Sequence, residues 1–372
     1  MKQLFRYIVL LMVAFETFSC VTEIRDFEQI EGNSLLTIEA ILSNQEGPHK
    51  ILLSYSSPSI SINVENIPIK NARVYITDDK NKRQDLNESI AGTYLTSSTF
   101  KGIVGNVYTL HIDLQNGKRY QSTPEKLLAV PIIDKINSKF AVKTNYPLTD
   151  ARSVGFDVTL DFKDAPEPNQ FYQWKWTHIE RAVYCAFCTN GFDFDKGRCT
   201  VDLNFNGKAE LLNYQCISSC FDIVYSSTYN ILSDNLFNGQ KIVNYPIARI
   251  PFSSYSLYYL KIEQRAISEK LFKYFRSIKS GTQNTGTLFD VPSETQYSPN
   301  IYSLDNKNEK ILGAFEVFGS QEKIIYIDRL SGTNGFSPVR VRGLGKDITP
   351  SPKAACIEGK YRTKTEPKDF RE

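Results

Sequence analysis

Six cysteines far from the N-terminus form the densest set of reactive side chains in the sequence. Thiolates at a Cys-x2-Cys spacing, as in "YCAFC", can ligate a tetrahedral zinc ion. An even number of cysteines in an exported chain is instead typical of disulfides. The second pair, "CISSC", has three intervening residues and departs from the zinc pattern, so we predict disulfides. The six candidates are Cys185, Cys188, Cys199, Cys216, Cys220 and Cys356.

The positions of these cysteines also predict where the disulfides act. Five of the six lie within residues 185–220, which we predict to be a cysteine-rich excursion from a β scaffold. Cys356 is distant in sequence and is predicted to tie the C-terminal tail back to this excursion. The sequence leaves the individual pairings open.

The seventh cysteine, Cys20, follows an N-terminal stretch with the layout of an export signal. "MKQLFRYIVLLMVAFETFSC" begins with the basic Lys2 and Arg6 and continues with an apolar run that is too short to span a bilayer. Ser19 then precedes the cysteine, which resembles the lipobox of bacterial lipoproteins. We predict that residues 1–19 are a signal peptide and that Cys20 receives the lipid. The alternative is an unmodified cysteine near an ordinary cleavage site.

The next residues and the composition restrict the class of protein further. Residues 20–33, "CVTEIRDFEQIEGN", are acidic and are predicted to be a tether between lipid and fold. The chain of 372 residues carries 44 basic and 41 acidic side chains, and this near balance predicts no nucleic-acid partner. Aromatic residues make up 12% of the chain, and together with short alternating runs they predict an all-β fold.

A possible calcium loop lies inside the cysteine-rich excursion. Asp202, Asn204 and Asn206 of "DLNFNG" match the opening of an EF-type loop, but position twelve is Asn213 rather than glutamate. The flanking residues alternate as strands do. We therefore interpret the stretch as an Asn-Gly hairpin, with calcium as the weaker alternative, and predict no metal or cofactor.

Three aromatic residues share one face of a predicted strand. Tyr172, Trp174 and Trp176 alternate in "FYQWKW". If exposed, they would form a stacking platform for sugars or other flat ligands. If buried, they would belong to the core, and this is the interpretation we prefer.

Catalytic patterns are not evident in the sequence. The three histidines, His49, His111 and His178, are isolated, and no metalloprotease, nucleophile-elbow or phosphate-loop motif occurs. We predict that the protein is not an enzyme.

The elements that must position these residues fall into two predicted domains. Residues 34–130 contain short alternating strands and a hairpin turn at Asn116-Gly117, which predicts an immunoglobulin-like β-sandwich. Residues 131–372 are predicted to form a larger β domain, which carries the excursion. Its single amphipathic helix is predicted over residues 268–280, with Ser268 as the N-cap and Gly281 at the end. Leu271, Phe272, Phe275 and Ile278 share the apolar face of this helix.

The order of several segments resembles the DUF4249 family of Bacteroidetes lipoproteins. These segments are "FSC", "NARVYITDD", "AGTYL", "GNVYTLHI", "NGKRYQS", "TPEKLLAVPIIDKI", "YFRSI", "GTLFDVPSETQYSPNI" and "EKILGAFEVFG". Each is weak alone, but their order and spacing are more specific. Departures occur at "SPNI", where Gly-Asn-Ile is expected, and at Ala314-Phe315, where Tyr-Phe is usual.

The resemblance implies a lipoprotein of unknown function that is often associated with a TonB-dependent outer-membrane transporter. With the lipobox, it predicts attachment to the outer membrane through the N-terminal lipid, on the cell surface or the periplasmic face. The acidic residues after Cys20 resemble those that accompany surface export in such lipoproteins, so we predict the cell surface. The expected function is a non-catalytic accessory or ligand-capture partner of such a transporter. The alternatives are an independent adhesin or glycan-binding lipoprotein, motivated by the aromatic stripe, and a hydrolase of surface polymer.

Overall fold

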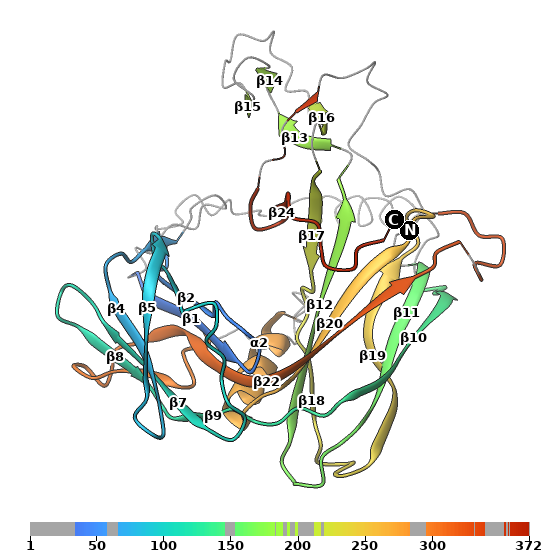
Figure 1. Cartoon of the computed structure of the whole chain (residues 1–372). Helices are drawn as coiled ribbons and strands as arrows, with labels where there is room; N and C mark the ends of the chain where they lie inside the picture. Colours follow the sequence, from blue (N-terminus) through green and yellow to red (C-terminus); the bar gives the residue numbers. More distant parts are fainter. Residues whose placement is uncertain are drawn as a thin grey trace, which may run out of the picture.

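The structure is a computed structural model in which the fold is mainly β, as the sequence predicts (Figure 1). It describes residues 34–57, 66–145, 153–182, 219–282, 295–330, 332–338 and 358–371, with shorter pieces at 184–188, 192–193, 198–199, 212–216, 353–354 and 356. One helix occurs among these residues. Two β units lie side by side, and a smaller β excursion projects above the second unit.

The first unit packs its strands around one apolar core. Alternate residues of its strands point inward, as the buried-exposed pattern of β7 shows. Asn116 and Gly117 turn the chain from β7 to β8, and Gly117 takes a positive φ of 84°. The strands are β1 (Leu36–Ser43), β2 (Lys50–Tyr55), β3 (Ile67–Pro68), β4 (Arg73–Asp78), β5 (Arg83–Ile90), β6 (Thr93–Leu95), β7 (Val107–Asp113), β8 (Arg119–Ser122) and β9 (Glu125–Lys126).

The second unit packs two sheets against each other. One sheet has the order β10-β11-β19, and the other contains β20, β12, β17 and β24, with β18 paired to β12. Their facing sides share a second core that is rich in aromatic side chains. The bounds are β10 (Ile133–Val142), β11 (Val154–Lys163), β12 (Phe171–Arg181), β17 (Phe221–Tyr225), β18 (Asn230–Ser233), β19 (Lys241–Pro251), β20 (Tyr258–Ala266) and β24 (Arg362–Thr363).

One long strand, β22 (Ile311–Ile327), joins the two units into a continuous sheet. Its first half pairs in parallel with β1, and its second half pairs antiparallel with β20. Gly313 permits the close approach to β1, because a Cβ there would lie 2.1 Å from the Ile38 carbonyl oxygen. β21 (Ile301–Ser303) pairs with β8. Residues 301–318, which the sequence division at 130 places in the second domain, therefore complete the first core.

The helix α2 (Glu269–Thr282) lies against the sheet where the two units meet (Figure 1). Ser268 caps its start, because its Oγ accepts a hydrogen bond from the Leu271 backbone N–H at 3.4 Å. The predicted apolar face is buried against Phe171 of β12 and against Ala314 and Phe318 of β22. The helix runs one residue past Gly281, so this glycine lies inside it.

The cysteine-rich excursion forms two small sheets of its own. One has the order β13-β16-β23 and the other pairs β14 with β15. The short strands are β13 (Tyr184–Cys188), β14 (Phe192–Asp193), β15 (Arg198–Cys199), β16 (Leu212–Cys216) and β23 (Lys353–Ala354). β23 pairs in parallel with β16, so the C-terminal segment returns to the excursion.

Candidate functional site

The aromatic stripe predicted on β12 belongs to the second core. The Tyr172 side chain is fully buried, Trp174 is 1% exposed and Trp176 is half-buried. The indole Nε1–H of Trp174 donates to Gln264 Oε1 at 2.9 Å. A stacking role for Tyr172 and Trp174 is therefore wrong, because the second sheet covers the face that a ligand would need.

A disulfide joins Cys220 to Cys356, which ties the C-terminal segment to the base of the excursion. Cys216 is also disulfide-bonded. The side chains of Cys185, Cys188 and Cys199 lie outside the described residues, and so do Cys20, Asp202, Asn204 and Asn206. The lipid and calcium predictions are therefore unchanged by the structure.

The three histidines lie in three separate places. His49 packs edge-on against Phe100, with ring centroids 6.1 Å apart. His111 stacks on Tyr75, and its Nε2 lies 2.9 Å from Thr77 Oγ1. His178 is buried, and its Nδ1 lies 2.8 Å from the Tyr259 carbonyl oxygen. Each histidine has its own local structural role, and the fold does not bring them together.

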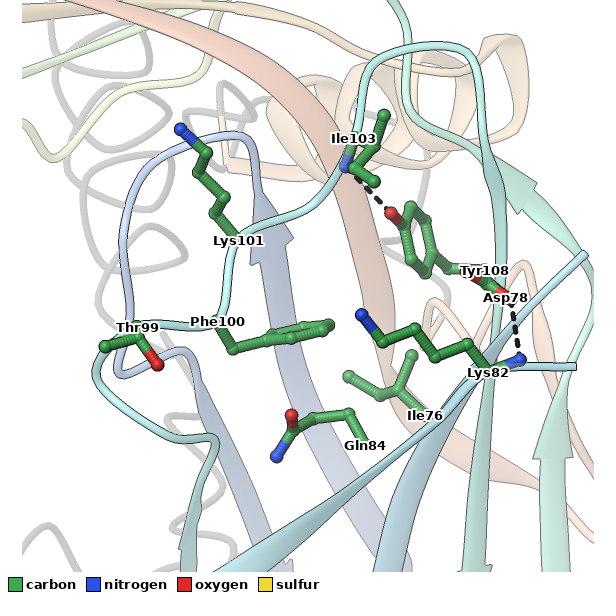
Figure 2. A pocket seen from close by; sticks show the side chains of 9 residues that line it. All are labelled: Ile76, Asp78, Lys82, Gln84, Thr99, Phe100, Lys101, Ile103 and Tyr108. Carbon is green, nitrogen blue, oxygen red and sulfur yellow. Dashed lines mark hydrogen bonds between the residues drawn. The ribbon is translucent and has the colours of Figure 1, made fainter. Parts of the chain in front are cut away.

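A pocket of about 230 Å³ opens at one end of the first core (Figure 2). Its floor is apolar and includes Ile76 and Tyr108, which are themselves core residues. Polar side chains surround the opening. The lining residues are Ile76, Asp78, Lys82, Gln84, Thr99, Phe100, Lys101, Ile103 and Tyr108.

One wall of the pocket is the loop of residues 96–106 between β6 and β7, which backbone hydrogen bonds hold in place. The Gly47 N–H donates to the Phe100 carbonyl at 2.9 Å, and the Gly102 N–H donates to the Ser43 carbonyl at 2.8 Å. A Cβ at Gly102 would lie 2.9 Å from the Ser43 carbonyl oxygen and 2.3 Å from Leu127 Cδ1, so a larger residue would force the loop or Leu127 to shift. The loop therefore presents Phe100 and Ile103 to the pocket in a fixed position.

The opposite wall is the turn between β4 and β5. Asp78 Oδ1 accepts hydrogen bonds from the backbone N–H groups of Lys80 at 2.9 Å and Lys82 at 2.8 Å. This side-chain cap closes the turn, and Asn81 takes a positive φ of 60° within it. Figure 2 shows the Lys82 side chain extending from this turn toward Phe100.

The charge at the pocket opening is positive. Lys82 and Lys101 contribute two ammonium groups and Asp78 one carboxylate. Within the part of the chain that the structure describes, neither lysine forms an ion pair. On the floor, burial raises the pKa of Tyr108, whose hydroxyl oxygen accepts a hydrogen bond from the Ile103 N–H at 2.8 Å. The arrangement suits an acidic group at the rim and an apolar group below it.

Sequence reasoning missed this pocket. Its residues come from three strands, a turn and a loop, and none belongs to a recognisable motif. The available signals were the turn residues "DDKNK" and the glycine-flanked apolar tip "KGIVGN". These signals predict that each segment is a loop or turn. They do not predict that the two segments lie opposite each other in the folded chain.

The described residues contain neither a candidate metal cluster nor a membrane-spanning helix. No group of three or more His, Cys, Asp or Glu side chains converges there in a way that could hold a metal ion. None of the helices there has the length and hydropathy needed to cross a bilayer.

The structure defines a mainly β protein with an open pocket, two lysines among its lining residues, and a disulfide-tied excursion. A family model described as "Domain of unknown function (DUF4249)" matches residues 22–324, which is more than half of the chain. The protein therefore belongs to the DUF4249 family. A search of curated proteins found no match.

Proposed function

We propose that this protein is an outer-membrane lipoprotein that captures a ligand and works beside a TonB-dependent transporter. The pocket of the first unit carries the ligand-capture part of the proposal. The lipobox around Cys20 and the resemblance to lipoproteins of this family support the anchoring and the transporter partnership. The display side is the cell surface, in keeping with the acidic residues after Cys20.

The pocket indicates the chemistry of the ligand. The floor formed by Ile76, Phe100 and Tyr108 can bury an apolar group, and burial of apolar surface would supply most of the affinity. Lys82 and Lys101 at the rim favour an acidic group. We therefore propose an amphipathic anion, such as a molecule with one carboxylate or sulfonate and an apolar body.

The transporter partnership is tested by purification from native outer membranes. The protein carries a C-terminal tag, the membranes are solubilised in mild detergent, and the bound proteins are identified by mass spectrometry. Recovery of a β-barrel transporter in stoichiometric amount supports the partnership. Recovery of the tagged protein alone would reject it.

The lipid anchor is tested with Cys20→Ser. This variant should remain unprocessed or should leave the membrane fraction, because it has no thiol to acylate. Retention in the membrane as a processed protein equal to the wild type would reject lipidation at Cys20.

The ligand-capture part is tested with anilinonaphthalene sulfonate, a fluorescent anion with an apolar ring system. The double variant Lys82→Gln/Lys101→Gln should weaken binding about tenfold, because each lost charge removes attraction at the rim. Lys80→Gln is the matched control, since Lys80 lies in the same turn but does not line the pocket. Equal affinities in all three proteins would place the probe elsewhere and reject the proposal.

A further inference from the structure

A buried carboxylate in the second unit has no neutralising partner in the described structure. Asp234 is 1% exposed, and neither of its carboxylate oxygens has a hydrogen-bond partner. It also forms no ion pair with a described lysine, arginine or histidine. An ionised carboxylate in an apolar interior is strongly unfavourable unless it is paired or binds a metal.

A second buried carboxylate, Asp164, lies near the same tyrosine as Asp234. Tyr172 of β12 pairs with Leu232 of β18, and Asp234 follows Leu232 by two residues, so its side chain lies on the same face as Tyr172. The Tyr172 hydroxyl donates to Asp164 Oδ1 at 2.5 Å. Asp164 is 2% exposed. Burial first, then the bonded Asp164, and also the charge of Asp234 raise the pKa of Tyr172, so both carboxylates lie near this hydroxyl, next to the second core.

Two loops hold these carboxylates in place at the β18 end of the second unit (Figure 1). The Asp164 N–H donates to the Gln240 carbonyl at 2.9 Å, and the Gly239 N–H donates to Asp164 Oδ2 at 2.9 Å. The Asp234 N–H donates to the Gln170 carbonyl at 3.1 Å. The loops 164–170 and 234–240 are thus cross-linked around the two acids.

We propose that Asp164 and Asp234 bind a calcium ion between these loops. Calcium is a hard cation that accepts carboxylate, carbonyl and hydroxyl oxygens. Two carboxylates would balance its charge, and peptide carbonyls of the two loops would complete its ligands. The site is separate from the pocket of the first unit and from the predicted calcium loop at Asp202. The calcium proposal therefore does not depend on the proposed function.

The experiment uses the purified full chain and two readouts. The first is thermal unfolding in excess calcium and in chelator, where calcium should raise Tm by about 5 °C in the wild type. The second is terbium luminescence, with terbium as the calcium substitute. The Trp174 ring lies 6.1 Å from the Tyr172 ring and serves as the light-absorbing donor.

Asp234→Asn keeps the shape of the side chain and removes its charge. It should abolish both the calcium shift and the terbium signal. In chelator it should be at least as stable as the wild type, because it removes an uncompensated buried charge. Tyr172→Phe removes the hydroxyl that bonds to Asp164 but leaves both carboxylates in place. It should therefore keep most of the calcium-dependent rise in Tm, and it controls for the loss of a polar contact near the site.

Asp202→Asn is the matched control for the calcium loop suggested by the sequence. It should leave both readouts unchanged. Equal Tm values of the wild type in calcium and in chelator would overturn the proposal. So would a calcium shift that survives in Asp234→Asn and disappears in Asp202→Asn.

Discussion

The two β units bury very different side chains, although one strand runs through both. The first core is made almost entirely of aliphatic residues and tyrosines, and the first unit buries only one formally charged side chain among its described residues, Glu125. The second unit, as far as it is described, buries Asp164, Asp234, Arg265 and Arg329. Apolar burial depends little on pH or ions, whereas buried charges require specific partners. The stability of the second unit should therefore depend more than that of the first on the hydrogen bonds and ion pairs of its buried charges.

Arg329 illustrates how the second unit satisfies a buried charge. Its guanidinium is 1% exposed and bonds to the loop between β19 and β20. Nε donates to the Ser256 carbonyl at 2.8 Å, and one terminal nitrogen donates to Ser254 Oγ at 2.5 Å and Ser256 Oγ at 2.8 Å. Its charge also lies 5.1 Å from the centre of the Tyr258 ring. These contacts hold the loop against the end of β22.

The largest effect is expected from breaking the aromatic core of the second unit. Trp174 packs against Tyr245 and Phe162, with ring centroids 4.5 and 5.6 Å away. Trp174→Ala should lower the free energy of unfolding by about 3–5 kcal/mol, because it opens a cavity and leaves Gln264 Oε1 without its donor.

Ile38→Ala in the first core is the matched comparison for Trp174→Ala. This substitution should lower the free energy of unfolding by about 2–5 kcal/mol, because Ile38 is buried in the first core. Chemical denaturation of both variants, followed by tryptophan fluorescence and circular dichroism, shows whether each unit unfolds by itself. Wild-type stability of Trp174→Ala would contradict the core assignment.

The next effect concerns the disulfide of the second unit. Replacing Cys220 and Cys356 by serine should destabilise the attachment of the C-terminal segment by about 2–4 kcal/mol, because it removes a cross-link between residues far apart in sequence. Hydrogen exchange should increase at β24 and at the strand β17 that pairs with it. Unchanged exchange there would show that strand pairing alone holds the segment. Exchange in the first core serves as the internal control.

A smaller effect is expected from the buried arginine. Arg329→Met keeps most of the side-chain volume but removes the donors to Ser254 and Ser256. It should lower the free energy of unfolding by about 1.5–3 kcal/mol. Arg371→Met is the matched control, because Arg371 is exposed at the C-terminal end of the described chain. Equal unfolding midpoints for the two variants would contradict the role given to Arg329.

The smallest effect tests the pH response of the first unit. Burial, as the leading cause, lowers the pKa of His49 from its ordinary value of 6.5. The unfolded chain then binds the proton more readily than the folded chain. The contribution of neutral His49 to stability is therefore complete above pH 6.5 and is lost as the pH falls from 6.5 toward the folded pKa.

His49→Gln should flatten this slope of unfolding free energy against pH. His111→Gln should remove a separate part, because burial lowers the pKa of His111 as well. A wild-type slope in His49→Gln would show that the folded and unfolded chains protonate His49 equally, which contradicts the lowered pKa of His49 in the folded chain. The same slope in both variants and the wild type would assign the response to other groups.

Local features were predictable because a few neighbouring residues encode them. The period of "SEKLFKYFRSIKSG" and the cap at Ser268 predicted α2, and Asn116-Gly117 predicted its hairpin. The link of Cys356 to the excursion also followed from an isolated cysteine near the C-terminus and a cluster elsewhere. The immunoglobulin-like character of the first unit stays a prediction.

The alternating pattern of Tyr172 and Trp174 established that they share a face, but only the tertiary structure decided that this face is buried. A strand's period of two distinguishes its faces and says nothing of what covers them. In the same way, β22 pairs with β1 and β20, and the pocket joins a turn to a distant loop. Hydrogen bonds also join the loop that begins at Asp164 to the loop that begins at Asp234. The sequence by itself determined the strands, the helix and the family. The folded chain decided which strands became neighbours, because pairing between distant strands depends on the burial and hydrogen bonding of the whole sheet.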